Sequence, residues 1–268
     1  MDDVARFNID RWQTLVEANA PFTRPLLNLD AETARDRFDP EGLFGDLTGK
    51  DVLCLAGAGG QQSAAFAILG AQVTVFDLSE AQLERDREAA AHYQIPIQTA
   101  QGDMRDLSGF APASFDLIYQ PYSLGFVPDA RIVFAEVART LRPGGMYFFA
   151  MHNPFYCGLS EADWNGEGYS LKLPYTDGAR VSMPDPEWVY SQSEESSVPA
   201  NHGQRESQEY RQTLGKVMNS LIRLGFSLIH FSDARDFTGD PEAEPGTWDH
   251  FISIAPPWLA FWWRYEPV

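Results

Sequence analysis

The chain has 268 residues, of which 44% are hydrophobic and 13% aromatic, so it is long enough for one large domain with a substantial core. Its 38 acidic residues outnumber its 20 basic residues and give a formal net charge of −18. Because phosphates would be repelled from most of such a surface, the charge argues against a nucleic-acid partner and leaves a small neutral or cationic ligand open.

Hydropathy and cysteine usage restrict the location of the protein. No run of about 18 apolar residues is present, and Met1 to Val4 lack the basic and apolar parts of a signal peptide. Of the two cysteines, Cys54 falls in a predicted buried strand and Cys157 lies far from it, so a disulfide framework is not expected. The five histidines are scattered, and no Cys/His cluster has metal-ligand spacing. We expect a cytoplasmic protein with no metal and no membrane partner.

The first predicted element is a helix over residues 1–20, with Trp12 and Leu15 among its apolar side chains and Pro21 at its end. A polar, proline-containing connector then runs to Lys50. Residues 1–49 are therefore predicted to form an N-terminal helical cap.

Strands and helices alternate strictly in the next part of the chain, residues 50–152. The strands are predicted at 51–56, 72–77, 95–99, 115–120 and 145–151. This alternation predicts a parallel sheet with helices on both faces and right-handed crossovers. Ligands of such sheets bind beyond the carboxyl ends of the strands, where the winding direction reverses. We therefore predict a cofactor-binding core here.

The turn after the first predicted strand carries the strongest sequence signal. Four small residues run from Ala56 to Gly59, Gly60 follows, and a helix-like segment comes next. A strand, a glycine-rich turn and a helix together bring bare backbone N–H groups to a ligand. Asp77 ends the next strand, where an acid can accept hydrogen bonds from both hydroxyls of a ribose. The pattern predicts a nucleoside-containing cofactor.

Three later segments separate the possible cofactors. Gly102-Asp103-Met104 follows the third strand, and such an acid and apolar side chain can accept from an adenine amino group and lie against the ring. The fourth strand ends in a polar-proline step at Gln120 and Pro121. The helix predicted over 130–141 stops at Pro143-Gly-Gly145, immediately before an apolar strand.

In this order and spacing the motifs resemble the class I S-adenosylmethionine-dependent methyltransferases, especially the small-molecule branch with a methyltransferase-type-11 core. The resemblance covers about residues 50–152. It implies an α/β fold, a Rossmann-like doubly wound seven-stranded sheet in the order 3-2-1-4-5-7-6 with only the last strand antiparallel. It also implies that the chain transfers a methyl group from S-adenosylmethionine to a small-molecule acceptor.

The same resemblance assigns cofactor-binding residues. Asp77 would hold the ribose diol, and Asp103 and Met104 would hold the adenine. The full predicted set is Ala56, Gly57, Ala58, Gly60, Gln61, Asp77, Leu78, Gly102, Asp103, Met104, Gln120 and Pro121.

The chain departs from the family pattern at the glycine-rich turn. The family usually has an acid that helps to orient the cofactor's amino group, and Cys54 stands in its place. Ala56 stands where the first glycine is usual. We expect a side-chain oxygen of Gln61 or Gln62 to compensate.

Residues 153–205 are rich in Gly, Pro, Ser and acids but contain seven aromatic residues, so they are not expected to be simply disordered. The family places variable insertions after the fifth strand, and we predict a substrate-cover insertion here. Its aromatic rings either stack on a substrate or pack the insertion onto the core.

The C-terminal part of the sheet is predicted within residues 206–268. Its expected elements are a helix at 207–224 and strands at 226–231 and 248–255. The closing aromatic residues, Trp258, Phe261, Trp262 and Trp263, have two interpretations. They form either a dimer surface, which makes a homodimer possible, or a segment buried against the sheet.

Candidate catalytic residues lie after the fourth and fifth strands. Tyr122 and His152 are predicted near the mouth of the site. A general base is required only if the acceptor holds its proton at working pH. His152 is either that base or a hydrogen-bonded structural histidine.

Two other functions fit part of the pattern. Gly57-x-Gly59 followed by Asp77 also suits an NAD(P)-dependent oxidoreductase. That interpretation lacks a third small residue, since Gln62 stands there, and it leaves Asp103 and Met104 unexplained. A non-catalytic S-adenosylmethionine-binding protein is the second alternative, because the turn is altered at Cys54 and Ala56.

Overall fold

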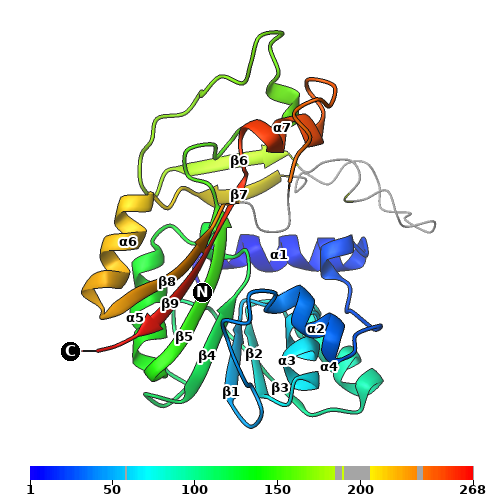
Figure 1. Cartoon of the computed structure of the whole chain (residues 1–268), viewed down its shortest axis with the longest axis vertical. Coiled ribbons are helices and arrows are strands. Elements are labelled where there is room, and N and C mark those ends of the chain that lie inside the picture. Colours follow the sequence, from blue (N-terminus) through cyan, green and yellow to red (C-terminus); the bar gives the residue numbers. More distant parts are fainter. Residues whose placement is uncertain (58, 185–188, 190–205, 234–237, 268) are drawn as a thin grey trace.

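The computed structural model describes residues 1–57, 59–184, 189, 206–233 and 238–267. Its strands are β1 (Asp51–Leu55), β2 (Gln72–Asp77), β3 (Ile97–Gln101), β4 (Phe115–Gln120), β5 (Leu141–His152), β6 (Arg180–Pro184), β7 (Glu206–Tyr210), β8 (Phe226–Ser232) and β9 (Trp258–Tyr265). Its α-helices are α1 (Asp3–Glu17), α2 (Ala31–Phe38), α3 (Gln62–Ile68), α4 (Glu80–Tyr93), α5 (Ala130–Thr140), α6 (Leu214–Arg223) and α7 (Trp248–Ile254). Figure 1 shows their arrangement.

Seven of the described strands form one sheet, in the order β3-β2-β1-β4-β5-β9-β8. Strands β1 to β5 pair in parallel, whereas β9 runs antiparallel to both of its neighbours, β5 and β8. The last strand in the chain is thus inserted beside the fifth, which confirms the predicted order 3-2-1-4-5-7-6 and the doubly wound, Rossmann-like fold. Strands β6 and β7 pair separately as an antiparallel ribbon.

Two hydrophobic clusters, one on each face, hold the sheet between its helices. Phe38 of α2 and Phe66 of α3 pack on one face, together with Leu83 of α4. Phe134 of α5 and Leu221 of α6 pack on the other. Because both faces are covered, the central strands are buried almost throughout, as is usual for parallel sheets.

Helix α5 illustrates how the sequence determines these layers. Asp129 caps its start by accepting from the Arg131 backbone N–H at 3.1 Å. Val133 and Val137 point into the core at helical spacing, whereas Ile132 is 48% exposed. The helix ends at Thr140, close to the predicted boundary.

The prediction for the last strand was wrong. Residues 248–255 contain helix α7, and the final strand is β9, which begins after Pro256 and Pro257. Along β9, Phe261 and Trp263 enter one hydrophobic cluster while Trp262 enters the other. These aromatic side chains are at most 2% exposed, so they fill the core between β5 and β8 and do not form a dimer surface.

The helix predicted at 207–224 was wrong in its first part and right in its second. Residues 206–210 form strand β7, and the helix begins only at Leu214. Burial alternates along β7, with Ser207 and Glu209 buried. These two buried side chains are two residues apart, as expected on one face of a strand, but both are polar. Alternation of hydrophobic residues, which is the usual sequence signal of a strand, is therefore missing here. Strand β3 lies two residues later than predicted.

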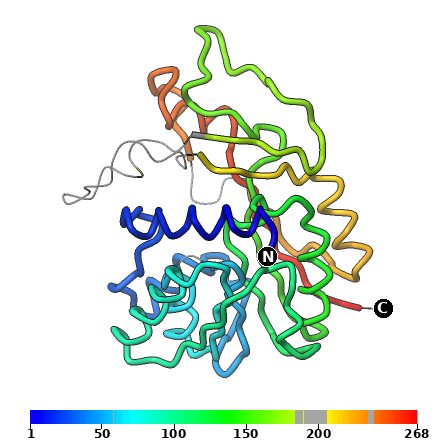
Figure 2. The backbone as a smooth tube through the Cα atoms, turned by 180° about the vertical axis from the view of Figure 1, so that it is seen from behind, coloured from blue at the N-terminus to red at the C-terminus, as the bar shows by residue number. Residues whose placement is uncertain are grey.

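Helix α1 separates two parts of the molecule. Figures 1 and 2 both place it between the parallel part of the sheet and the part that holds β6, β7 and α7. The described residues of the predicted insertion, 153–184 and 189, belong to this second part, while 185–188 and 190–205 lie outside the described residues.

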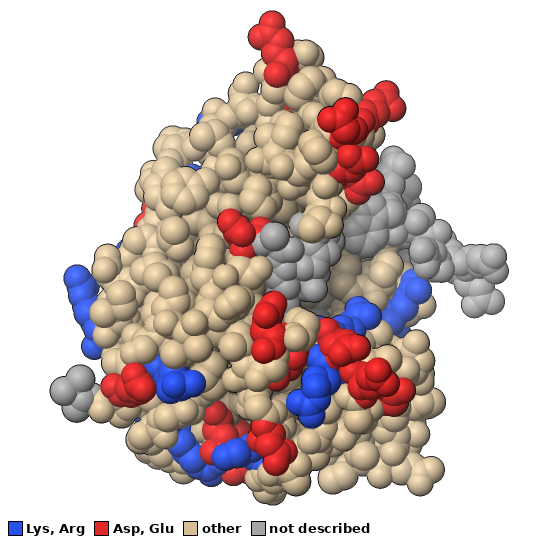
Figure 3. Space-filling view, viewed as in Figure 1, with Lys and Arg blue, Asp and Glu red and all other residues tan. Residues whose placement is uncertain are grey.

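Acidic side chains gather over α7 and the residues before it on the face that Figure 3 shows. Glu242, Glu244 and Asp249 are exposed residues of this segment. Basic side chains on this face lie nearer the sheet, among acidic ones. In the part of the chain that the structure describes, none of the helices combines the length and the hydropathy needed to cross a bilayer.

Candidate active site

A cavity of about 1290 Å³ lies beyond the carboxyl ends of β1, β2, β4 and β5, where the strand order reverses. Its walls come from α1, these strand ends, β7, the segment after β5 and the region from α7 to β9. Typical small-molecule pockets measure roughly 300–1,000 Å³. This cavity is larger and therefore has room for two ligands side by side.

Most of the predicted cofactor residues line this cavity. They are Ala56, Gln61, Asp77, Leu78, Gly102, Asp103, Met104 and Pro121. Gly57, Gly60 and Gln120 are not among the lining residues, and Ala58 lies outside the described residues. The two predicted catalytic residues, Tyr122 and His152, also line the cavity.

The glycine-rich turn packs closely against α4. Gly59 and Gly60 have positive φ angles of 61° and 80°. A Cβ atom on Gly60 would lie 2.6 Å from the backbone oxygen of Arg85, so a larger residue would displace the helix. Ala56 also has a positive φ, 47°, which is unfavourable for a residue with a Cβ.

Asp86 anchors this turn from α4. Its Oδ1 accepts from the Gly60 backbone N–H at 2.8 Å and from the Ser63 hydroxyl at 2.5 Å. Burial raises the pKa of Asp86 to about 7, although these donors oppose the shift. Sequence analysis missed this residue, because an acid within a helix is usually solvated.

The departure from the family pattern at Cys54 alters the core and not the cavity wall. Its side chain is 1% exposed, packs in the same hydrophobic cluster as Phe66 and Tyr119, and is not among the lining residues. Gln61 does line the cavity, and its Nε2 donates to the backbone oxygens of Phe22 and Arg24 at 3.2 and 3.0 Å. Gln61 thereby ties the N-terminal cap to the turn.

Asp77 and Gln82 are buried polar residues that face the cavity. Asp77 is 9% exposed, and its Oδ1 accepts from the Ser79 backbone N–H at 2.8 Å. Burial raises the pKa of Asp77 to about 7. Gln82 is 1% exposed, and neither atom of its amide has a hydrogen-bond partner among the described residues. A ribose hydroxyl pair would satisfy the Asp77 carboxylate, so the residues present fit a nucleoside-containing cofactor.

Arg105 connects the predicted adenine-binding acid to α1. Its Nε donates to Asp103 Oδ1 at 2.9 Å, and its Nη1 donates to Asp2 Oδ2 at 2.7 Å. Asp2 caps α1 by accepting from the Ala5 backbone N–H at 2.9 Å. This ion-pair chain fastens the start of α1 to the loop after β3.

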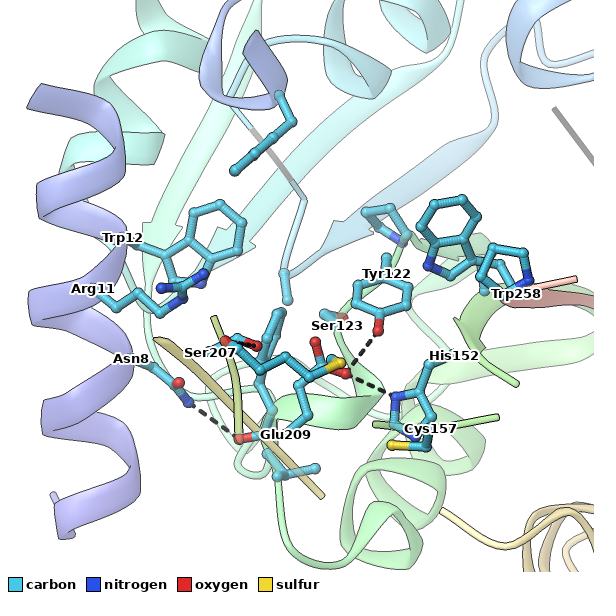
Figure 4. Close-up of a pocket in the computed structure, with 18 of the residues that line it drawn as sticks. Asn8, Arg11, Trp12, Tyr122, Ser123, His152, Cys157, Ser207, Glu209 and Trp258 are labelled. Carbon is cyan, nitrogen blue, oxygen red and sulfur yellow. Dashed lines mark hydrogen bonds and ion pairs between the residues drawn. The ribbon is translucent and has the colours of Figure 1, made fainter. Parts of the chain in front are cut away.

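A second contact fastens the middle of α1. The Asn8 side chain donates to the Phe126 backbone oxygen at 3.1 Å, and the Trp12 ring meets the Phe126 ring edge-on at 5.9 Å. In Figure 4, Asn8, Arg11 and Trp12 project from α1 toward the other labelled residues of the site. Helix α1 therefore forms one wall of the cavity.

Gln120 supports the site from behind. Its side chain is fully buried, and its Nε2 donates to Ser123 Oγ at 2.9 Å and contacts Met104 Sδ at 3.2 Å. Tyr147 donates its hydroxyl hydrogen to Gln120 Oε1 at 2.6 Å. This network positions Met104, which itself lines the cavity.

Tyr122 and His152 meet at Glu209, a residue that sequence analysis missed because its segment was predicted as helix. The Tyr122 hydroxyl donates to Glu209 Oε2 at 2.7 Å, and His152 Nδ1 lies 2.9 Å from the same oxygen (Figure 4). Burial opposes the charged form of His152, but Cys157 and Glu209 outweigh it and raise the pKa of His152 to about 9. Burial, with Glu209, raises the pKa of Tyr122 well above its usual value. These contacts therefore favour the protonated form of His152.

Aromatic side chains from separate segments surround this polar group. Those lining the cavity include Trp12, Tyr122, Phe126, Tyr156, Trp248, Phe251 and Trp258. Among the residues that the structure describes, no group of three or more His, Cys, Asp or Glu side chains is placed to hold a metal ion.

Comparisons with known proteins agree with this geometry. Residues 53–149 match a family described as a methyltransferase domain. The uncharacterized methyltransferase YbaJ of Bacillus subtilis is 31% identical over 222 residues, which cover 83% of this chain and 83% of that protein.

Two further proteins resemble this chain, one in the sequence of part of the chain and the other in fold alone. A ubiquinone biosynthesis O-methyltransferase of Idiomarina loihiensis is 37% identical over 113 residues, covering 42% of this chain and 45% of that protein. The crystal structure of an S-adenosylmethionine-dependent methyltransferase from Mesorhizobium loti matches with a TM-score of 0.60 at 23% identity. That match covers 89% of this chain and 100% of the other, and it shows a shared fold.

Proposed function

Because this chain belongs to the class I S-adenosylmethionine-dependent methyltransferases, we propose that it methylates a small-molecule acceptor by in-line displacement. The observation that carries the proposal is a single cavity lined both by Asp77 and Asp103 and by Tyr122, His152 and Glu209. The bound cofactor supplies a methyl group that the positive charge on sulfur has already activated. The protein then has to align the acceptor and exclude water. Such alignment can lower the activation free energy by about 7–11 kcal/mol.

The residues proposed to hold the cofactor come from consecutive strand ends. Asp77 would bind the ribose hydroxyls, because it is a buried carboxyl group at the cavity wall. Asp103 and Met104 would bind the adenine, and the turn that begins at Ala56 would face the methionyl portion. Gly60 and Gln120 support these residues from behind, since they contact Asp86 and Met104.

Two segments are proposed to exclude water. Helix α1 of the N-terminal cap would cover the cofactor, and it already contributes a wall of the cavity. The insertion after β5 would cover the acceptor, because Tyr156, Leu159 and Met183 of its described part line the same cavity.

The acceptor class and the location are supported by simpler observations. The Idiomarina relative, 45% of which is covered, is an O-methyltransferase, and this supports an oxygen as the methylated atom. A net charge of −18 opposes a nucleic-acid acceptor. Cys54 and Cys157 are both free and buried, which supports a cytoplasmic location.

The proposal is tested by calorimetry with S-adenosylhomocysteine and with NAD, followed by transfer of a labelled methyl group to a panel of small acceptors. We expect S-adenosylhomocysteine to bind, NAD not to bind, and label to reach at least one acceptor. Binding of NAD alone would overturn the proposal. Binding of S-adenosylhomocysteine with no labelled product would favour the non-catalytic binding protein instead.

A further inference from the structure

The contact between Glu209 and His152 depends on a glycine. Gly125 lies in the short helix that follows Tyr122, and a Cβ atom there would come within 3.0 Å of His152 Nδ1 and 3.1 Å of Glu209 Oε2. The side chains of His152 and Glu209 are each 5% exposed. The fold therefore reserves a buried position for this pair at the cavity wall, although burying two charged groups costs free energy.

The charges in this group compensate one another. Cys157 and Glu209 raise the pKa of His152 and favour its charged form, while Tyr122, with its pKa well above the usual value, stays neutral. Cys157 is the remaining titratable side chain beside His152. A carboxylate that already has a buried cation at 2.9 Å has little attraction left for an ammonium group. The pair therefore favours an uncharged acceptor over an amine.

The second oxygen of Glu209 is placed to receive a hydrogen bond. Tyr122 and His152 both contact Oε2, and no hydrogen bond to Oε1 is found among the described residues. Glu209 lines the cavity, so a ligand hydroxyl can reach this carboxylate. The rings nearby suit a flat acceptor, since Trp258 stands edge-on to Tyr122 at 6.3 Å and lies 5.8 Å from Trp248.

We propose that Glu209 takes the proton of an uncharged ring hydroxyl while that oxygen is methylated, and that Tyr122 and His152 hold the carboxylate in position. The acceptor oxygen forms the new bond to carbon, its proton passes to Glu209, and the electron pair of the broken carbon–sulfur bond stays on sulfur. A phenol, with a pKa near 10, releases its proton to a carboxylate far more readily than an aliphatic alcohol does. The inference rests on the proposed function and names its acceptor class.

The test follows the His152 ring by NMR in protein labelled with ¹³C-histidine and saturated with S-adenosylhomocysteine. The variant His152→Asn identifies the signal by removing it. Catechol and benzylamine are the probes, because they share one ring but carry uncharged hydroxyls or an ammonium group. We expect catechol to shift the His152 signal saturably and benzylamine to leave it unchanged.

Two variants on the same strand separate the proposed role from a structural one. In Glu209→Gln we expect catechol to bind at least tenfold more weakly and the pKa of His152 to fall from about 9. Glu206→Gln is the matched control, since Glu206 is exposed and pairs with Ser182, and it should behave as the wild type does.

Each outcome of this test decides the inference. A missing catechol shift, a larger shift with benzylamine, or unchanged catechol binding in Glu209→Gln would overturn it. Failure of the protein to bind S-adenosylhomocysteine at all would instead contradict the proposed function. The pKa of His152 is also informative, because an unchanged value in Glu209→Gln would show that the carboxylate does not hold the ring.

Discussion

The cavity contains two buried carboxylates with opposite surroundings. Asp77 is 9% exposed, and no cation pairs with it among the described residues. Glu209 is 4% exposed, and its Oε2 lies 2.9 Å from His152 Nδ1. Asp77 accepts a hydrogen bond from the Ser79 backbone N–H and, as we propose, further ones from ligand hydroxyls, whereas Glu209 is the acid that we propose to take a proton. The comparison sets the carboxylate that we propose to bind the cofactor apart from the one that we propose to react.

The two acids also come from different kinds of structure. Asp77 ends a strand of the regular βα core, close in sequence to the helix start at Ser79. Glu209 reaches Tyr122 across 87 residues, through a ribbon that lies outside the main sheet. The proposed cofactor end thus follows from local sequence, and the proposed acceptor end follows from tertiary contacts.

The largest expected effect is the loss of cofactor affinity in Asp77→Asn. Asn lacks the charge that makes a carboxylate a strong acceptor, and hydrogen bonds to charged groups contribute about 1.5–3 kcal/mol each. We expect S-adenosylhomocysteine to bind about 100-fold more weakly by calorimetry, while the fold persists because an unpaired buried charge has been removed. Glu209→Gln is the matched comparison and should leave this affinity within about twofold. A similar loss in both variants would contradict the separation of the two ends.

The next effect is a pH dependence of cofactor affinity. The pKa of Asp77 is raised to about 7, so the carboxyl is protonated below that pH, whereas ligand hydroxyls favour its ionised form. Binding below pH 7 must therefore release a proton. Affinity for S-adenosylhomocysteine should rise up to about tenfold per pH unit below 7 and level off above it.

The control for this pH profile is Asp77→Asn. Asp86 also has a pKa of about 7 and lies beside the turn, so it remains titratable in the variant. A flat profile in Asp77→Asn together with a sloping wild type would assign the proton to Asp77. If the slope persists in the variant, Asp86 or another group is responsible.

A smaller effect is expected where α1 joins the cofactor end. Asp2→Asn removes the ion pair with Arg105 but keeps a good N-cap residue, so the helix itself should persist. The Asp2 side chain is 52% exposed, and such pairs contribute about 0.2–1 kcal/mol. We expect S-adenosylhomocysteine affinity to fall about two- to fivefold at low salt, and the difference to vanish near 1 M salt.

Asp3→Asn provides the control for this variant. It removes the same charge from the same helix turn, but Asp3 is 95% exposed and, among the described residues, pairs with Arg6 of α1 alone. Equal losses in the two variants would point to the helix dipole instead of the link to Arg105.

The sequence predicted the βα core well because its signals are local. Glycines, a Ser79 cap and short apolar strands define β1 to β5 without reference to distant residues. The failures share a physical cause. Strand β9 is buried on both faces and shows no polar alternation, and β7 buries polar side chains whose partners lie far away in sequence. Glu209 therefore carried no signal, whereas Tyr122 and His152 were identified from their places at strand ends.

The smallest expected effect concerns Ala56, which stands in the turn where the family usually has glycine. Ala56 adopts a φ of 47°, a left-handed conformation that costs an L-residue about 1–2 kcal/mol. Glycine removes this cost but is more flexible in the unfolded chain by roughly 0.5–1 kcal/mol. Ala56→Gly should therefore raise the free energy of unfolding by about 0.5–1 kcal/mol in urea denaturation.

Ala113→Gly distinguishes backbone strain from an effect of the cavity. Ala113 has a φ of 53°, is exposed and does not line the cavity, so the same substitution there should give a similar gain in stability. If both variants are stabilised but only Ala56→Gly changes the affinity for S-adenosylhomocysteine, the alanine at the turn adjusts cofactor binding as well as stability. If Ala56→Gly is less stable than the wild type, the packing contacts of the Ala56 methyl group outweigh its backbone strain. Packing alone would then explain why the turn tolerates alanine where the family usually has glycine.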